Sequence, residues 1–296
     1  MLKRSLGIHN GVFHADEVAA TALLILYDLI DKDKIRRTRN PKILEECEFV
    51  CDVGGIYDPD KKRFDHHQSS YEGPLSSAGM VLLYLKEHKI LSAEEYHFFN
   101  HSIIKGIDDH DNGRSPQNPG ICTFSHVIAN FSPITYDCSE EELLEAFFNA
   151  VAFTGGHLKR VHERFLFNKK CKEDVNEAMK RGNLCLFFDR ALPWVENFFS
   201  LEGVNHPALF LIMPAANHWK LRGIPPDLEH RMQVRLPLPE KWAGLLEDDL
   251  KKECMIPGAI FCHKGRFTSV WETKEDAITA LKTVLTMNGI EYEDTF

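Results

Sequence analysis

Histidine and aspartate side chains are grouped into four short clusters in the N-terminal part of this 296-residue chain. The clusters are His9-x4-His14-x-Asp16, then Asp52, then Asp65-His66-His67, and last Asp108 with Asp109 and Asp111. Imidazole and carboxylate ligands without thiolate suit a divalent first-row metal, manganese being favoured as carboxylates increase and zinc as imidazoles do. Six or seven such ligands exceed one tetrahedral site. They are enough for two metals roughly 3.5–4 Å apart, the arrangement that supports phosphoryl transfer.

The clusters follow the ends of elements that hydrophobic patterns predict. The predicted elements are a strand at 6–9, a helix at 16–30, a buried strand at 48–53, a hairpin at 57–64, and helices at 76–88 and 92–107, the last with a capping box at Ser92 and Glu95. In open α/β sheets, ligands bind beyond the carboxyl ends of the strands, where such loops converge. We therefore expect the clusters to meet there, with Asp52 placed to bridge both metals.

The second half of the chain has a different pattern of predicted elements. A helical stretch at 140–181 is followed by short strand-like runs at 184–188, 208–213, 232–236 and 259–262, and by a helix at 274–288. The predicted fold class is α/β: an N-terminal, mostly parallel sheet domain over residues 1–180, including a helical connector, and a smaller α+β domain over residues 181–296. The second domain is expected to bind substrate.

Charge and cysteine content limit the functional classes. The chain has 35 Lys and Arg against 44 Asp and Glu, a formal charge of −9, whereas proteins that hold polyphosphate through broad surface electrostatics are basic. A phosphate ligand therefore requires a locally positive site.

Eight cysteines without a CxxC pair indicate free thiols in a reducing compartment, and the start of the chain lacks the apolar core of a signal peptide. The apolar run at 18–30 is too short to span a membrane, so a cytoplasmic enzyme is expected.

The clusters, taken together, resemble a known superfamily. Asp65-His66-His67 matches the DHH signature, and the other three clusters follow the order of motifs in the DHH phosphoesterases. More closely, the segments HNGVFHADEVAA, CDVGGIYDPDKKRFDHHQ, DDHDNG, LPW, RLPLPEKW and FCHKGRF are similar to the melanocyte-proliferating-gene family, also known as metal-dependent protein hydrolases. The resemblance spans about residues 6 to 285.

The resemblance implies a role for each matching residue. His9 and His14 would hold one metal, Asp16, His66 and Asp108 would hold the other, and Asp52 would bridge them, with Asp111 as the alternative ligand from the fourth motif. His67 would face the substrate phosphate, and Asp65 would orient the histidine pair, as carboxylates behind ligating imidazoles commonly do. His67, Asp52 and Asp65 thus form the expected catalytic group. For Glu17, Asp109 and His110, a supporting role and a solvated loop position stay equally open.

The same resemblance implies a C-terminal domain that grips substrate, often through a paired-glycine loop. Residues 265–271 lack the glycine pair. Lys264 and Arg266 would instead supply charge and Trp271 a stacking surface, since stacking on an aromatic ring contributes about 1–3 kcal/mol per base in single-strand binders.

These expectations combine into a metal-dependent phosphodiesterase. The expected activity is that of a 3′-5′ exonuclease on single-stranded RNA or short oligonucleotides, with two divalent ions, Mn²⁺ first and Mg²⁺ or Zn²⁺ as alternatives. A small-molecule phosphohydrolase acting on dinucleotides or pyrophosphate with the same site is the alternative. A non-catalytic metal-stabilised binding module is disfavoured by the intact ligand set. The acidic balance predicts no stable binding to duplex DNA, and no membrane partner is expected.

Overall fold

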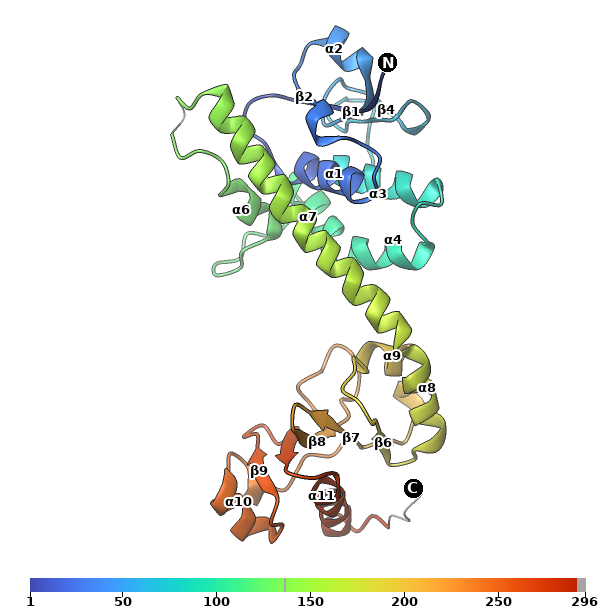
Figure 1. The fold of residues 1–296 in the computed structure, drawn as a ribbon, viewed down its shortest axis with the longest axis vertical. Helices are drawn as coiled ribbons and strands as arrows, with labels where there is room; N and C mark the ends of the chain where they lie inside the picture. Colours follow the sequence, from blue (N-terminus) through green and yellow to red (C-terminus); the bar gives the residue numbers. More distant parts are fainter. Residues whose placement is uncertain (136, 292–296) are drawn as a thin grey trace. The chain divides into compact units, whose positions relative to one another are not determined.

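The computed structural model describes residues 1–135 and 137–291. It divides into two compact units, Met1–Phe165 and Leu166–Phe296, and each has its own sheet and its own apolar core (Figure 1).

The sheet of the first unit is mostly parallel. Its strand order is β2-β1-β3-β5-β4, in which β1 (Leu2–Ile8), β2 (Ile35–Arg37), β3 (Cys47–Cys51) and β5 (Arg63–Phe64) run parallel and β4 (Tyr57–Asp58) pairs antiparallel at the edge. The β4–β5 hairpin, with the short helix η2 (Pro59–Lys61) at its tip, confirms the predicted hairpin at 57–64. All four parallel strands therefore direct their carboxyl ends to the same edge.

Helices cover both faces of this sheet. The helices α1 (Ala15–Leu26) and α3 (Ser77–Glu87) pack together over Leu6, Phe49 and Phe64 in the main core. On the other face, α2 (Pro41–Glu46) places Leu44 against Cys47 and Val50. Gly7 in β1 permits this close approach, because a β-carbon there would collide with the side chain of Leu44.

Further helices complete the first unit. They are η1 (Lys32–Lys34), α4 (Ala93–Phe99), the π-helical turn η3 (Asn100–Ile104), α5 (Lys105–Asp111), α6 (Phe124–Ala129) and most of α7 (Glu140–Lys170). The predicted capping box at Ser92 is present, because its hydroxyl accepts from the Glu95 amide and the Glu95 carboxylate accepts from Ser92. The helix expected at 92–107 continues through η3 to Asp111, which places the fourth cluster on the last turn of α5.

The second unit has a mixed sheet with the order β6-β7-β8-β10-β9. Its strands are β6 (Cys185–Phe187), β7 (Phe210–Ala215), β8 (His218–Gly223), β9 (Ala259–Cys262) and β10 (Thr268–Trp271). The β6–β7 pair is parallel, and the other pairs are antiparallel. Its helices are α8 (Lys172–Arg181), α9 (Val195–Ser200), η4 (Gly203–Asn205), η5 (Glu240–Trp242), α10 (Glu247–Cys254) and α11 (Lys274–Met287).

Two expectations differ from the structure. The chain divides between Phe165 and Leu166, inside α7, earlier than the boundary expected near residue 180, because Val175 and Ala178 of α8 pack into a core of the second unit. The stretch 232–236 is not a strand; instead β8 and β10 occupy the centre of the sheet. Proline at 237 and 239 restrains the chain after residue 236. Within this stretch, Arg235 N donates to the carbonyl of Ile224, the residue after β8.

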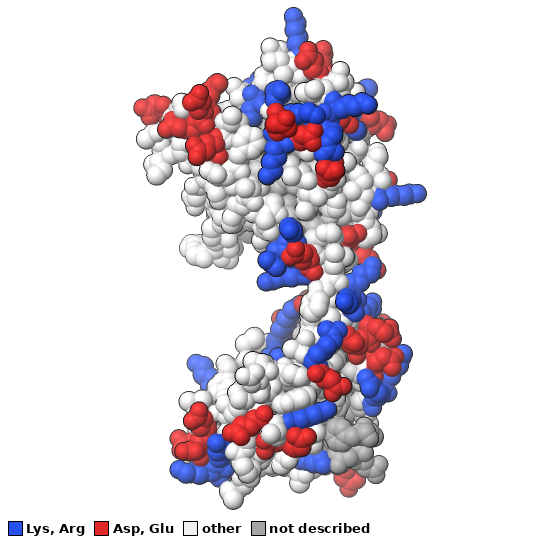
Figure 2. Space-filling model, in the orientation of Figure 1, with Lys and Arg blue, Asp and Glu red and all other residues white. Residues whose placement is uncertain are grey.

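The surface carries charges of both signs, and the cysteines are unpaired. On the face shown in Figure 2, acidic and basic side chains occur together in patches on both units, with an acidic group over the first turn of α7. The eight cysteines are free thiols, six of them buried. Among the described residues, no helix combines the length and apolar character that crossing a membrane requires.

Candidate metal centre

The carboxyl ends of three parallel strands carry three of the seven predicted metal ligands, His9, Asp52 and His66. His9 follows β1, Asp52 follows β3, and Asp65-His66-His67 follow β5. Three groups of side chains offer ligand atoms within 4.8 Å of one another: His9, His14, Glu17 and Asp52; Asp52, His66 and His67; and His14, Asp16 and Asp111. The structure thus brings together ligands from all four sequence clusters.

Asp52 belongs to two of the groups. Its Oδ2 lies 3.3 Å from His9 Nε2, whereas its Oδ1 lies 3.4 Å from His66 Nε2 and 3.5 Å from His67 Nδ1. The residue has φ of 56°, a left-handed conformation that aspartate adopts more readily than most residues and that is often found at functional sites. Each carboxylate oxygen therefore faces a different imidazole set, as a bridging ligand requires.

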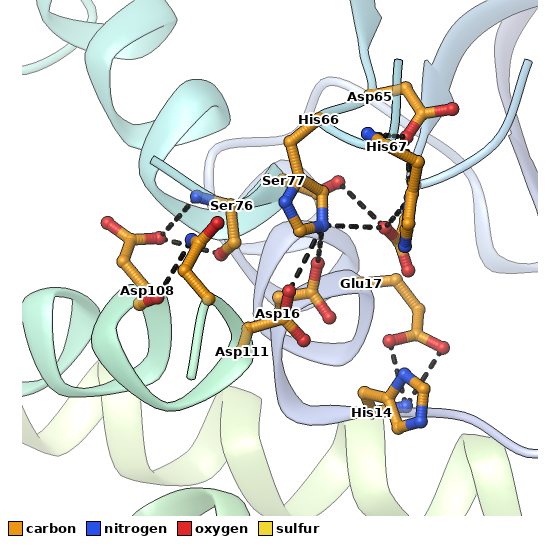
Figure 3. A network of polar contacts seen from close by, with 12 residues as sticks. His14, Asp16, Glu17, Asp65, His66, His67, Ser76, Ser77, Asp108 and Asp111 are labelled. Atoms are coloured by element: carbon orange, nitrogen blue, oxygen red, sulfur yellow. Dashed lines mark hydrogen bonds and ion pairs between the residues drawn. The ribbon is translucent and has the colours of Figure 1, made fainter. Parts of the chain in front are cut away.

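His66 occupies the centre of the second half of the site. Its Nε2 lies 3.0 Å from Asp111 Oδ2, 3.4 Å from Asp52 Oδ1 and 3.8 Å from Asp16 Oδ2 (Figure 3). One imidazole nitrogen cannot satisfy three carboxylates, because it has a single proton or a single lone pair to offer.

Unpartnered buried atoms show that these residues fit a metal. Asp16 is fully buried, and neither of its carboxylate oxygens has a hydrogen-bond partner among the described residues. His66 Nε2, although it lies 3.0 Å from Asp111 Oδ2, makes no hydrogen bond of good geometry with a described residue. A buried carboxylate without a partner is strongly unfavourable unless it is neutralised or coordinates a cation. The donor set, oxygens and imidazole nitrogens, is one that Mn²⁺ or Zn²⁺ accepts.

Asp108 and Asp111 take different positions. Asp108 Oδ1 accepts from Ser76 N at 3.0 Å, Ser76 Oγ at 2.6 Å and Gly79 N at 3.1 Å, so it holds the N-terminus of α3. A β-carbon at residue 79 would overlap this carboxylate, which explains the glycine. Figure 3 shows Asp111 facing His66 and Asp108 turned toward Ser76. The geometry thus favours Asp111, the alternative, over Asp108, the preferred ligand of the sequence analysis.

Asp65 lies behind the histidine pair. Its Oδ2 accepts from Gly55 N at 2.6 Å, and its Oδ1 lies 2.8 Å from His67 Nδ1. The carboxylate therefore fixes one ring nitrogen of His67, whose side chain is 62% exposed. The contact is to His67, and the role expected for Asp65 in orienting the histidine pair stays a prediction.

The electrostatics of the site follow from close packing of opposite charges. Burial disfavours the imidazolium form, but hydrogen bonds to Asp52 and Glu17 outweigh it and raise the pKa of His9 to about 10. Burial likewise opposes charge on His66, but Asp111 and Asp52 raise its pKa to about 10. Burial and the neighbouring Asp52 raise the pKa of Asp16 well above its ordinary value. Protons and a divalent ion would compete for the same nitrogen and oxygen atoms.

Two residues of the site were not assigned from the sequence. Glu17 is fully buried; its carboxylate accepts from His14 N and lies 2.9 Å from His9 Nε2. Arg39, two residues beyond β2, lines a cavity of about 560 Å³ together with His9, His14, Asp52 and His67. No carboxylate of the described residues lies within 4 Å of its guanidinium. Arg39 follows the end of β2, which is the pattern that points to it, whereas Glu17 lies in the first turn of α1.

The predicted substrate residues of the second unit divide into two kinds. Lys264 is exposed and Arg266 half-buried in the turn between β9 and β10. Trp271 is fully buried in the core, and its indole N–H donates to Ser269 Oγ at 2.9 Å. A ring without exposed surface cannot stack on a base, so the stacking role expected for Trp271 is withdrawn.

Metal binding should stabilise the protein. We expect Mn²⁺ at about 100 times its Kd to add about 2.7 kcal/mol of stability, which corresponds to a Tm increase of about 5–10 °C. Asp16→Asn should remove most of this increase while changing the Tm of the metal-free protein little, because asparagine has the shape of the neutral acid. Differential scanning calorimetry with and without Mn²⁺ measures both. Asp33→Asn, an exposed site, is the matched control, and an undiminished Mn²⁺ effect in Asp16→Asn would contradict the assignment.

Fold and site together define a class of protein: an α/β domain that collects imidazole and carboxylate ligands beyond the carboxyl ends of its parallel strands. A family model described as MYG1_exonuc, Uncharacterised protein family (UPF0160), matches residues 5–285. The chain belongs to this MYG1 family. The match covers nearly the same stretch as the resemblance found from the motifs.

Individual relatives span almost the whole chain. The MYG1 protein of Chlamydia pneumoniae is 50% identical over 290 residues, covering 98% of this chain and 99% of its own length. The MYG1 exonuclease of Homo sapiens is 31% identical over 330 residues, covering 95% and 85%. Among solved structures, an exonuclease RecJ bound to manganese is similar with a TM-score of 0.30 at 12% identity, covering 98% and 91%. A TM-score this low supports no conclusion about the fold or the function of this chain.

Proposed function

We propose that the chain is a two-metal phosphodiesterase that acts as a 3′-5′ exonuclease on single-stranded RNA or short oligonucleotides. The observation that carries the proposal is the position of Asp52, whose two oxygens face separate imidazole sets beside the unpartnered oxygens of Asp16. Relatives in the same family are named exonucleases, which supports the nuclease class. The free cysteines favour a reducing compartment, in agreement with a cytoplasmic location.

Two ligand sets share Asp52. His9, His14 and Glu17 would hold one ion, Asp16, His66 and Asp111 the other, and Asp52 would contact both. Bound divalent ions, with Mn²⁺ favoured by the carboxylate content, would supply Lewis acidity for phosphoryl oxygens and a nucleophilic water at neutral pH.

The chain's own residues at the cavity would bind and orient the substrate. His67 is held by Asp65 at Nδ1, which leaves Nε2 for a proton of the phosphate or the leaving oxygen. Arg39 lines the same cavity, and its guanidinium has no carboxylate partner among the described residues. A guanidinium can hold two phosphate oxygens at once. The cavity volume of about 560 Å³ lies within the range of small-molecule sites and suits a terminal nucleotide.

Arg39→Ala should weaken substrate binding. A charge-assisted hydrogen bond contributes about 1.5–3 kcal/mol, so kcat/KM for a short RNA should fall about 10–100-fold, mainly through KM. Steady-state kinetics with a labelled trinucleotide measures the change. Arg36→Ala, an exposed arginine on β2 that does not line this cavity, should leave the kinetics near wild type. An unchanged KM in Arg39→Ala would remove the residue from the proposed substrate site.

The proposed activity is tested with 5′-labelled and 3′-labelled single-stranded RNA and DNA, a dinucleotide and pyrophosphate, each with Mn²⁺, Mg²⁺ or chelator. A ladder of progressively shortened 5′-labelled RNA, absent with chelator, is the expected result. Early release of the 5′-label as a mononucleotide would reverse the polarity. Turnover of the dinucleotide or pyrophosphate alone would replace the exonuclease by a small-molecule phosphohydrolase, and no turnover of any substrate would overturn the proposal.

A further inference from the structure

The sheet of the second unit presents two cations on one face. In the antiparallel β8–β10 pair, Lys220 lies opposite Val270 and Arg222 opposite Thr268, and in the β9–β10 pair Phe261 lies opposite Val270. Residues directly opposite each other in an antiparallel pair point to the same face. Lys220, Arg222, Phe261, Thr268 and Val270 therefore share one face of the sheet, here named the outer sheet face.

The helices beside these strands cover the opposite face. Leu221 and Trp271, which alternate with the residues of the outer sheet face, are fully buried with Leu250 of α10 and Leu281 of α11. The helices α8 and α9 lie on the side of the outer sheet face but over β7, where Leu211, opposite Arg222 in the β7–β8 pair, is buried with Val175 and Phe198. All five residues of the outer sheet face remain partly exposed, and none belongs to an apolar core cluster among the described residues.

The two cations lack counter-charges. Neither Lys220 nor Arg222 has a carboxylate of the described residues within 4 Å; the Arg222 guanidinium lies 5.0 Å from the Phe267 ring centroid and donates to Arg231 O at 3.3 Å. Burial, together with repulsion from Arg222, lowers the pKa of Lys220, and burial lowers that of Arg222. Two neighbouring half-buried cations repel each other unless an anion lies between or over them.

The surrounding sequence strengthens the positive field. The strands β8, β9 and β10 and the turn between β9 and β10 contain no Asp or Glu, although the chain as a whole has a net charge of −9. The turn adds Lys264 and Arg266. Next to it, the rings of His263 and Phe267 are 4.3 Å apart, and those of Phe261 and His263 are 6.1 Å apart.

We propose that the outer sheet face binds the sugar-phosphate backbone of an unpaired nucleic-acid strand, with Phe261 and His263 as the stacking surface for a base. The proposal rests on the proposed nuclease function and assigns its polymer site to residues 220 and 222. Phosphates supply the missing counter-charge, and an unpaired base supplies a ring for the aromatic side chains. A duplex offers no free base, and the acidic remainder of the chain repels its denser charge.

The test uses the full chain and a fluorescently labelled single-stranded 20-mer RNA in the presence of chelator, so that binding is measured without cleavage. Lys220→Ala with Arg222→Ala should weaken binding at least 10-fold and reduce the slope of log affinity against log salt by about 1.4, since each phosphate contact on a single strand contributes about 0.7. Phe261→Ala should weaken binding about 10-fold with the slope unchanged. Lys241→Ala with Lys251→Ala, which removes the same charge on and beside α10, should change neither.

Three outcomes separate this site from the catalytic one. Turnover of bis(p-nitrophenyl) phosphate with Mn²⁺ should be the same in wild type and in the Lys220/Arg222 double variant, whereas KM for the RNA should rise. The wild type could hydrolyse this small diester and bind RNA while the double variant binds RNA equally well. That result would overturn the RNA-binding role of the outer sheet face and leave the proposed nuclease function standing. If the wild type hydrolyses neither substrate, the proposed function itself fails. If polyglutamate of the same charge competed with the labelled RNA as well as unlabelled RNA does, the ligand of this face would be an acidic peptide, and the proposal would be overturned.

Discussion

Asp52→Asn is expected to reduce phosphodiester hydrolysis by about 10³-fold or more. The carboxylate faces imidazoles of both ligand sets, with Oδ2 toward His9 and Oδ1 toward His66. Metal-based charge stabilisation contributes several kcal/mol to phosphoryl transfer, and about 4 kcal/mol corresponds to 10³ in rate. An amide has a neutral oxygen on one side only and cannot bridge. Hydrolysis of bis(p-nitrophenyl) phosphate and metal content by atomic absorption measure the two consequences.

The metal content decides whether the loss has the proposed cause. Asp52→Asn should retain at most one of two Mn²⁺ ions after gel filtration, and its metal-free form should remain folded by circular dichroism. Asp60→Asn, an exposed residue in η2 of the adjacent hairpin, should keep both the activity and the metal. Full metal content in an inactive Asp52→Asn would contradict the bridging role, and full activity would contradict the site.

The positions of three candidate site residues at strand ends could be predicted from the sequence. His9, Asp52 and Asp65 each come immediately after a parallel strand, and parallel strands bring their carboxyl ends to one edge whatever the details of packing. The hydrophobic pattern that predicts the strands was therefore enough to predict that these residues lie close together.

Prediction was limited where long-range packing decides the environment. Nothing local shows that Glu17 turns inward to His9, because a glutamate in the first turn of a helix is equally common in solvent. Trp271 is followed directly by the exposed Glu272, and only the alternation of β10 places it in the core. That strand was missed because a four-residue run is too short to show its period.

Asp111→Ala and Asp108→Ala are expected to have opposite consequences, although the two residues lie one helical turn apart on α5. Asp111 points to His66 and joins the ligand group of His14 and Asp16, so its removal should eliminate one metal and lower activity by about 10²-fold or more. The Tm of the metal-free protein should change little.

Asp108 instead accepts from the backbone amides of Ser76 and Gly79, which are buried at the start of α3. Asp108→Ala should leave these donors unsatisfied and cost about 3 kcal/mol of stability, a Tm decrease on the order of 10 °C. Its metal content and its activity below the Tm should remain near wild type. Asp108→Asn, which keeps an accepting oxygen, should recover much of the Tm and serves if the alanine variant does not fold. Loss of metal from Asp108→Asn at wild-type Tm, with metal retained in Asp111→Ala, would return the ligand role to Asp108.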